Sequence, residues 1–192
     1  AYEMQSISLR YFNVAGNTER VRERHDPETH LLPRLIHAAE SGDPFSIYGN
    51  DYATPDGSAL RDYVHVADVA AANLAAVNYL LRDGAPVGHT AVNIGSGVGT
   101  SVKQAISAVE RATKRTVNVE VQPRRAGDPP RLIADITRAV ALLNWRPRQS
   151  ETTRIIRSLR GALHAPHADV VEIEPTAFLG FEGLDEQVAG SD

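Results

Sequence analysis

The chain has 192 residues, of which 42% are hydrophobic and 23% charged, as in an ordinary soluble globular protein. The chain has a formal net charge of -4 and only two lysines, Lys103 and Lys114. We therefore expect no dedicated nucleic-acid-binding surface. The absence of cysteine excludes disulfides, thiolate metal sites and cysteine nucleophiles. The most apolar run, Val66 to Leu81, is interrupted by Asp68 and two asparagines. We therefore expect a cytoplasmic protein without a membrane partner.

The first elements follow one another closely. The stretch SISLRYFN, residues 6–13, alternates apolar and polar side chains as a strand does. A helix is predicted over 31–41, with Pro33 in its first turn and Gly42 where a helix stop is expected. A short strand over 45–48 comes next. Because the chain enters a strand within a few residues of its start, we expect it to begin partway through a fold.

A loop rich in turn residues, YGNDYATPDGSAL, leads from Tyr48 to the sequence RDYVHV. The last part of this segment, 63–66, is predicted as a strand. A long alanine-rich helix follows, in which Val69, Asn73, Val77 and Leu81 recur at helical spacing and Gly84 marks the end.

Strands and helices continue to alternate in the second half of the chain, which predicts an α/β fold. Asp135 is expected to cap the helix that carries Ile136 and Leu143. The predicted elements are a strand over 91–94, a helix over 102–113, a strand over 117–122, a helix over 136–143 and a last helix over 155–163.

The last part of the chain, 166–192, has a different composition. No lysine or arginine follows Arg160, whereas Asp169, Glu172 and five further acidic residues do. One-sign charge with few aromatic residues is typical of a solvated tail, so we expect this part to be flexible. The segment AFLGFEGL is an alternative, because its apolar residues could form a small partner-binding face.

Two apparent motifs do not carry chemistry. The turn from Gly95 to Gly99 follows a strand, but its third glycine comes one position too early for a dinucleotide-binding fingerprint. A tight turn between a strand and a helix, near a ligand, is therefore favoured. His25 and His30 are five residues apart across a proline and cannot share one helical face, so no metal site is predicted.

The arginines leave two interpretations open. Arg61 follows the long loop, and Arg124 and Arg125 precede Asp128 in the turn PRRAGD. Two guanidinium groups brought together from separate segments would hold a diphosphate. Most arginines are surface ion-pair partners instead, and composition alone does not decide between the two.

Six stretches, read in order, resemble one known family. They are LRYFNVAG, HDPETHLLP, YGNDYATPDGSALRDYVHVADVA, VNIGSGVGTSV, PRRAGDPPRLIAD and LLNW. Together they resemble the C-terminal half of the UDP-glucose 4-epimerase family, in the extended short-chain dehydrogenase/reductase superfamily, from Ser6 to Leu163. The resemblance implies that residues 1–165 form the C-terminal portion of an NAD(P)-binding Rossmann-type α/β fold and carry its substrate-binding lobe. The NDYATPDGS insertion before Arg61 is the most specific part of the match.

The resemblance implies roles for ten residues. Arg61 and Arg125 would hold the diphosphate of a UDP-sugar, Asp128 the uridine ribose, and Leu132 would form a wall of the sugar pocket. His30 stands where many members of the family have asparagine, and a leucine at 132 is intermediate in size, so acceptance of N-acetylated sugars stays open. The substrate-binding set is Asn13, His30, Leu31, Tyr48, Arg61, Arg125, Asp128 and Leu132, and Tyr11 and Phe12 would border the nicotinamide ring.

The family interconverts UDP-galactose and UDP-glucose by transient oxidation at C4 with bound NAD, usually as a homodimer. This chain lacks the family's glycine-rich strand-to-helix turn, and no tyrosine is followed four residues later by lysine. We therefore expect no catalytic residue here and no activity without an N-terminal half. Two alternatives stay open: a non-catalytic nucleotide-sugar binding module, or an epimerase for another UDP-sugar such as a pentose, a uronate or an N-acetylhexosamine.

Overall fold

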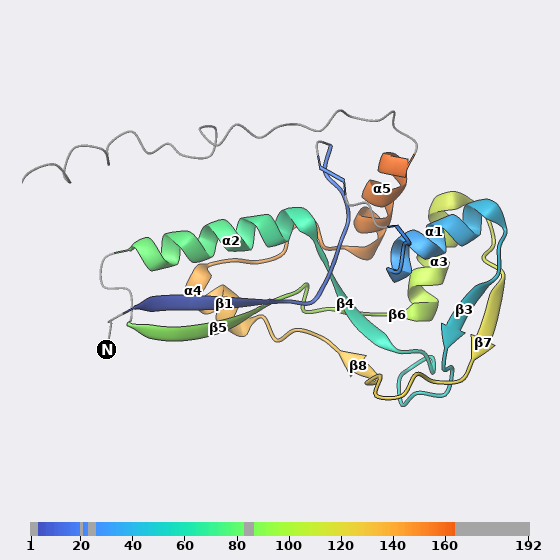
Figure 1. Ribbon diagram of the computed structural model, residues 1–192, viewed down its shortest axis with the longest axis horizontal. Helices are drawn as coiled ribbons and strands as arrows, with labels where there is room; N and C mark the ends of the chain where they lie inside the picture. Colours follow the sequence, from blue (N-terminus) through green and yellow to red (C-terminus); the bar gives the residue numbers. More distant parts are fainter. Residues whose placement is uncertain (1–3, 20, 23–25, 83–86, 164–192) are drawn as a thin grey trace, which may run out of the picture.

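The computed structural model describes residues 4–19, 21–22, 26–82 and 87–163 of the chain (Figure 1). Strands and helices alternate along it, which confirms the predicted α/β class. The elements are β1 (Gln5–Tyr11), β2 (Asn13–Ala15), α1 (Leu31–Ser41), β3 (Phe45–Tyr48), β4 (Leu60–His65), α2 (Val66–Leu81), β5 (Gly88–Ile94), β6 (Gly99–Ser101), α3 (Val102–Thr113), β7 (Val119–Gln122), β8 (Arg131–Leu132), α4 (Thr137–Leu143) and α5 (Thr152–Leu163).

One part of the structure, here called the sheet lobe, consists of β1, β5, α2 and α4. The two strands are parallel, with Leu9 opposite Val92 and Tyr11 opposite Ile94. Because side chains alternate along a strand, Leu9, Val92 and Ile94 share one face, and this face packs against α2 and α4. The opposite face, with Ser8 and Arg10, is exposed. The sheet lobe therefore has a core on one side only.

A second part, here called the helical lobe, gathers α1, α3 and α5 beside the parallel pair β3 and β7 (Figure 1). The helices have strong apolar faces at helical spacing, and these faces form one buried cluster. Gly42 ends α1 with a φ of 83°, a left-handed conformation that glycine adopts without a steric penalty. The largest buried side chains of this core are Leu32, Leu35, Ile36, Val109, Ile155 and Ile156.

Strand β4 joins the two lobes. Tyr63 belongs to the core of the helical lobe, and the next residue, Val64, belongs to the core of the sheet lobe. β4 pairs in parallel with β2, where Asn13 lies opposite Tyr63, and with β8, where Arg61 lies opposite Leu132. Residues that are far apart in the sequence thereby meet along one strand, and this strand positions the candidate site.

Asp62 holds two segments to β4 from the inside of the protein. Its side chain is 0% exposed. Its carboxylate accepts hydrogen bonds from Ser96 N and Ser96 Oγ (both 2.6 Å), Gly97 N (2.9 Å) and Ala134 N (3.0 Å). A side chain at Gly95 would collide with Ala134 and with Asp62 itself, so only glycine allows this close approach. The turn after β5 and the segment after β8 are therefore fixed by one buried charge.

The predicted elements are confirmed in type, but several of their details were wrong. Strand β5 starts at Gly88 and helix α5 at Thr152, each three residues earlier than predicted. The N-cap of α4 is Ile136 and not Asp135, although Asp135 Oδ1 accepts from Thr137 N at 2.9 Å. The segment that contains Leu60 already belongs to β4, so this strand starts three residues earlier than predicted. The helix α2 ends at Leu81, three residues before the predicted stop at Gly84. Val77 and Leu81 are exposed, and the buried face carries the smaller Ala72 and Ala76, since the helix lies close to β1 and β4.

Two further expectations concern membranes and the acidic tail. No helix among the described residues is long and apolar enough to cross a membrane. The tail over 166–192, including AFLGFEGL, lies outside the described residues. Its flexibility stays a prediction.

Because His65 is buried, we expect the free energy of unfolding to fall in acid. Its Nδ1 accepts a hydrogen bond from Ala67 N at 3.1 Å at the start of α2, which requires a neutral ring. Burial, with a smaller contribution from the charge of Arg154, lowers the pKa of His65 below its usual 6.5, although the Asp68 carboxylate opposes this. The unfolded chain therefore binds the proton more tightly than the folded one, and this stability is present above pH 6.5 and is lost as the pH falls through the lowered pKa.

His65→Asn keeps a side-chain acceptor at the helix start and removes the titration. We expect the wild type to lose stability relative to this variant as the pH falls from 7.5 to 5, in urea unfolding at each pH. Parallel stability curves for the two proteins would contradict the role of His65.

Candidate functional site

A cavity of about 590 Å³ lies where the ends of β1 and β2, the start of α1, β4 and β8 meet. Its walls are mostly apolar and aromatic, with a few polar groups among them, as in small-molecule sites. The residues that line it are Tyr11, Phe12, Asn13, Val14, Ala15, His30, Leu31, Leu32, Pro33, Tyr63 and Leu132.

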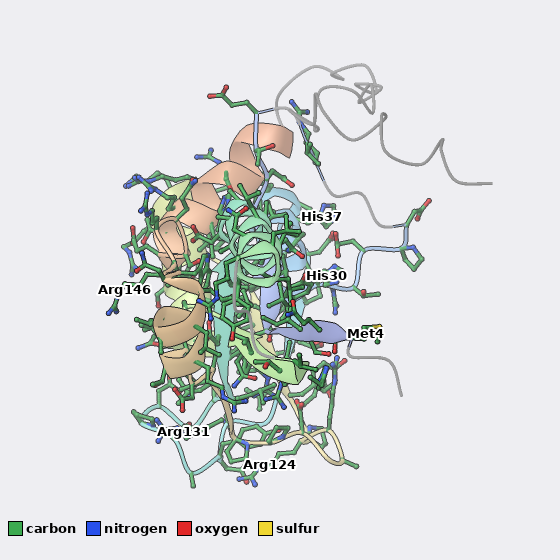
Figure 2. The ribbon with its side chains drawn as sticks, turned by 90° about the vertical axis from the view of Figure 1, so that its left-hand side faces the viewer. Met4, His30, His37, Arg124, Arg131 and Arg146 are labelled. Carbon is green, nitrogen blue, oxygen red and sulfur yellow. The ribbon has the colours of Figure 1, made fainter. Side chains whose placement is uncertain are left out.

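His30, the N-cap residue of α1, and Leu31, its first residue, line the cavity. His30 is held by Glu28, whose Oε1 accepts from His30 N at 2.7 Å and lies 2.9 Å from His30 Nδ1. Burial acts to raise the pKa of Glu28, but the hydrogen bonds and charge of His30 outweigh it and lower the pKa. A carboxylate therefore stands behind the imidazole and restricts its orientation. Figure 2 shows His30 and His37 on the same side of the molecule.

Tyr63 is a cavity residue that our sequence analysis did not single out. It is 6% exposed and lies opposite Asn13 in the pairing of β2 with β4. Burial raises the pKa of Tyr63 to about 12, and the nearby charge of Arg61 opposes this only in part. The phenol therefore stays neutral at physiological pH. Alternation along β4 could have indicated it, because residues two apart on a strand, such as 61 and 63, point to the same side.

Arg61 is the most tightly held cation of the candidate site. Its side chain is 13% exposed, and Nη2 lies 2.8 Å from Asp128 Oδ1. Nη1 donates to the carbonyl oxygens of Leu60 and Pro129, both at 2.9 Å. The guanidinium is therefore fixed before any ligand arrives. Two predicted ligand residues from distant segments, Arg61 and Asp128, are direct partners.

A second arginine covers an aromatic ring. The guanidinium of Arg125 lies 3.9 Å from the centre of the Tyr48 ring. Next to it, Arg124 lies 4.4 Å from the centre of the Tyr52 ring, and its Nε is 2.7 Å from Asp51 Oδ1. These contacts tie the loop after β3 to the segment after β7. Figure 2 shows Arg124 and Arg131 at the same end of the molecule.

The structure places the ten predicted site residues in two groups. Six line the cavity, and four form the pairs Arg61 with Asp128 and Tyr48 with Arg125. Arg61 connects the groups, because it lies opposite cavity residue Leu132 in the pairing of β4 with β8. Among the described residues, no cluster of histidine, aspartate and glutamate could hold a metal ion. The roles of the ten residues stay predictions.

The glycine-rich turn after β5 does not fit a dinucleotide pyrophosphate. The amides of Ser96 and Gly97, which such a turn would offer to phosphate, already donate to the Asp62 carboxylate. A second anion beside this buried charge would be repelled. The residues present therefore do not fit the pyrophosphate of NAD at this turn.

Comparison with known proteins gives the class of the chain. Residues 1–95 match the model of the NAD dependent epimerase/dehydratase family. The chain belongs to this family.

Within that family, the chain is similar to UDP-glucose 4-epimerases. The enzyme of Streptococcus mutans is 44% identical over 161 residues, which are 82% of this chain and 47% of the relative. A crystal structure of the Brucella ovis enzyme in complex with NAD has a TM-score of 0.75 at 44% identity and covers 82% of this chain and 49% of that one. The Bifidobacterium longum enzyme, in complex with NAD+ and UDP, has a TM-score of 0.71 at 30% identity, with 80% and 45% covered. The chain thus spans about half the length of the relatives it matches.

Proposed function

We propose that this chain is the UDP-sugar-binding, C-terminal part of a UDP-glucose 4-epimerase. In that enzyme it would act with a dinucleotide-binding N-terminal half, with NAD as cofactor, UDP-glucose and UDP-galactose as substrates, and a second copy as dimer partner in the cytoplasm. Residues 1–165 would carry this function, and 166–192 would be a flexible tail. Bound NAD would take up and return the hydride at the sugar's C4.

The meeting of six predicted ligand residues in one cavity carries this proposal. Arg125 has no ion pair with another described residue, and Arg61 is fixed by Asp128 on the strand that lies beside cavity residue Leu132. Two such guanidinium groups suit the two phosphates of UDP, since charge-assisted hydrogen bonds are the strong ones. The cavity wall is mostly apolar and offers few polar contacts. Binding energy concentrated on UDP would leave the sugar free to turn between the two hydride transfers.

The incomplete sheet lobe supports the need for a second half. Among the described residues, β1 pairs only with β5. Parallel sheets are normally larger and covered on both faces. Arg138 Nη1 donates to Ala91 O of β5 at 3.0 Å and so protects the edge of β5, whereas the outer edge of β1 pairs with no strand among the described residues. We propose this edge of β1 as the place where the sheet of the N-terminal half continues.

Titration calorimetry on the purified chain tests the proposal. We expect saturable binding of UDP and no binding of NAD, because the described glycine-rich turn is occupied by Asp62. We also expect no conversion of UDP-galactose to UDP-glucose, since the family's catalytic tyrosine and lysine pattern is missing from the sequence. Absence of UDP binding would contradict the proposed binding role of this chain. Epimerisation by a tag-free sample would contradict the proposal that activity requires an N-terminal half.

A further inference from the structure

Tyr11 lies at a point of the cavity where the fold alone does not hold a ring in place. It is the last residue of β1, at the carboxyl end of a parallel strand, where ligands bind in open α/β sheets. It lines the cavity and is 46% exposed, so core packing covers little more than half of it. An aromatic ring this exposed needs a further contact to keep one orientation.

Asn73 of α2 supplies that contact. The Tyr11 hydroxyl donates to Asn73 Oδ1 at 2.8 Å, across 62 positions in the sequence. The amide of Asn73 is itself oriented, because its Nδ2 donates to Val69 O at 2.8 Å. A flipped amide would place its oxygen against that carbonyl oxygen, two acceptors facing each other, so the orientation follows from the contacts.

We propose that Asn73 is a positioning residue that fixes Tyr11 as a wall of the ligand cavity. It touches no ligand itself and acts through the tyrosine ring. Asn73 is exposed, so its side chain is held by its hydrogen bonds and not by core packing. The inference rests on the proposed function, because the wall matters only if the cavity takes the sugar end of a UDP-sugar.

Asn78 provides a matched control on the same helix. It is an exposed asparagine of α2 and makes no side-chain hydrogen bond with another described residue. Asn73→Leu and Asn78→Leu therefore make the same chemical change at two exposed helix positions. Only the first removes the acceptor of the Tyr11 hydroxyl.

The experiment compares UDP with UDP-glucose as probes for the wild type, Asn73→Leu, Asn78→Leu and Tyr11→Phe. We expect Asn73→Leu to bind UDP as the wild type does and to bind UDP-glucose about two- to tenfold more weakly, the range set by one hydrogen bond. Tyr11→Phe should show the same selective loss of UDP-glucose affinity. The double variant with Asn73→Leu and Tyr11→Phe should lose no more than either single variant, since both substitutions remove the same hydrogen bond. Asn78→Leu should behave as the wild type.

A second measurement needs no ligand. Tyrosine labelled with ¹³C at Cζ gives one NMR signal for each of the six tyrosines, and Tyr11→Phe identifies that of Tyr11. We expect this signal to shift and broaden in Asn73→Leu and to stay unchanged in Asn78→Leu. An unchanged signal in Asn73→Leu overturns the positioning role whatever the titrations give. Equal UDP-glucose affinity in both leucine variants overturns its effect on ligand binding, whereas a wild type that binds no UDP contradicts the proposed function itself.

Discussion

Asp62→Ala should lower the free energy of unfolding by about 3 to 5 kcal/mol, the largest single-residue effect that we expect in this chain. The substitution leaves the amides of Ser96, Gly97 and Ala134 without their acceptor, two of them at a turn that Gly95 packs against the carboxylate. The Ala134 amide is buried, and a buried donor without a partner loses its hydration without compensation. Urea unfolding monitored by circular dichroism measures the loss.

Asp51→Ala is the matched control, because it also removes a hydrogen-bonded aspartate, but one that is exposed and bonded to Arg124. We expect at most a small change in stability, because exposed ion pairs of this kind contribute little. Similar losses for the two variants would contradict the structural role assigned to Asp62.

Arg61→Ala should weaken UDP binding by about 1 to 3 kcal/mol, or roughly 5- to 150-fold in Kd. The substitution removes a guanidinium fixed in place by Asp128, Leu60 O and Pro129 O. It also leaves the Asp128 carboxylate unpaired, which would repel the diphosphate. Calorimetric titration of UDP into each variant measures the effect.

Two controls separate the contact from general electrostatics. Arg131→Ala removes the same charge from the neighbouring strand β8, where the side chain is exposed, and should change Kd by less than about twofold. Asp128→Asn in the Arg61→Ala background removes the unpaired charge, so any recovered affinity reports the repulsion. Equal effects of Arg61→Ala and Arg131→Ala on Kd would contradict a specific UDP contact and indicate that Arg61 is an ordinary surface ion-pair partner.

The sequence predicted the local structure well, because each helix and strand carries its own periodicity and its own end signals. The apolar spacing in α1 and its glycine stop predicted its bounds at both ends. The capping box formed by Ser101 and Gln104 fixes the start of α3. In α2 the pattern failed in one respect, since alanines rather than the larger Val77 and Leu81 face the core. Which face of a helix is buried depends on its neighbours.

The candidate site was predicted mainly from the resemblance of short motifs. That resemblance did not indicate two residues of the site and one contact between predicted residues. Tyr63 could have been found from the alternation along β4, whereas nothing in the local sequence of Asn73 indicates that it supports a cavity wall. Asn73 reaches Tyr11 only because α2 packs on β1. Similarly, Arg61 and Asp128 were predicted to bind different parts of one ligand, and their direct pairing was not foreseen.

By itself, the sequence determined the family, the α/β class and the order of the helices and strands, because these depend on composition, periodicity and short motifs of contiguous residues. Only the tertiary structure decided that β4 joins two cores through Tyr63 and Val64, that Asp62 fills the glycine-rich turn, and that Asn73 holds Tyr11. These contacts join residues 34 and 62 positions apart. Pairings at that distance follow from packing whole elements against one another, and no local pattern encodes them.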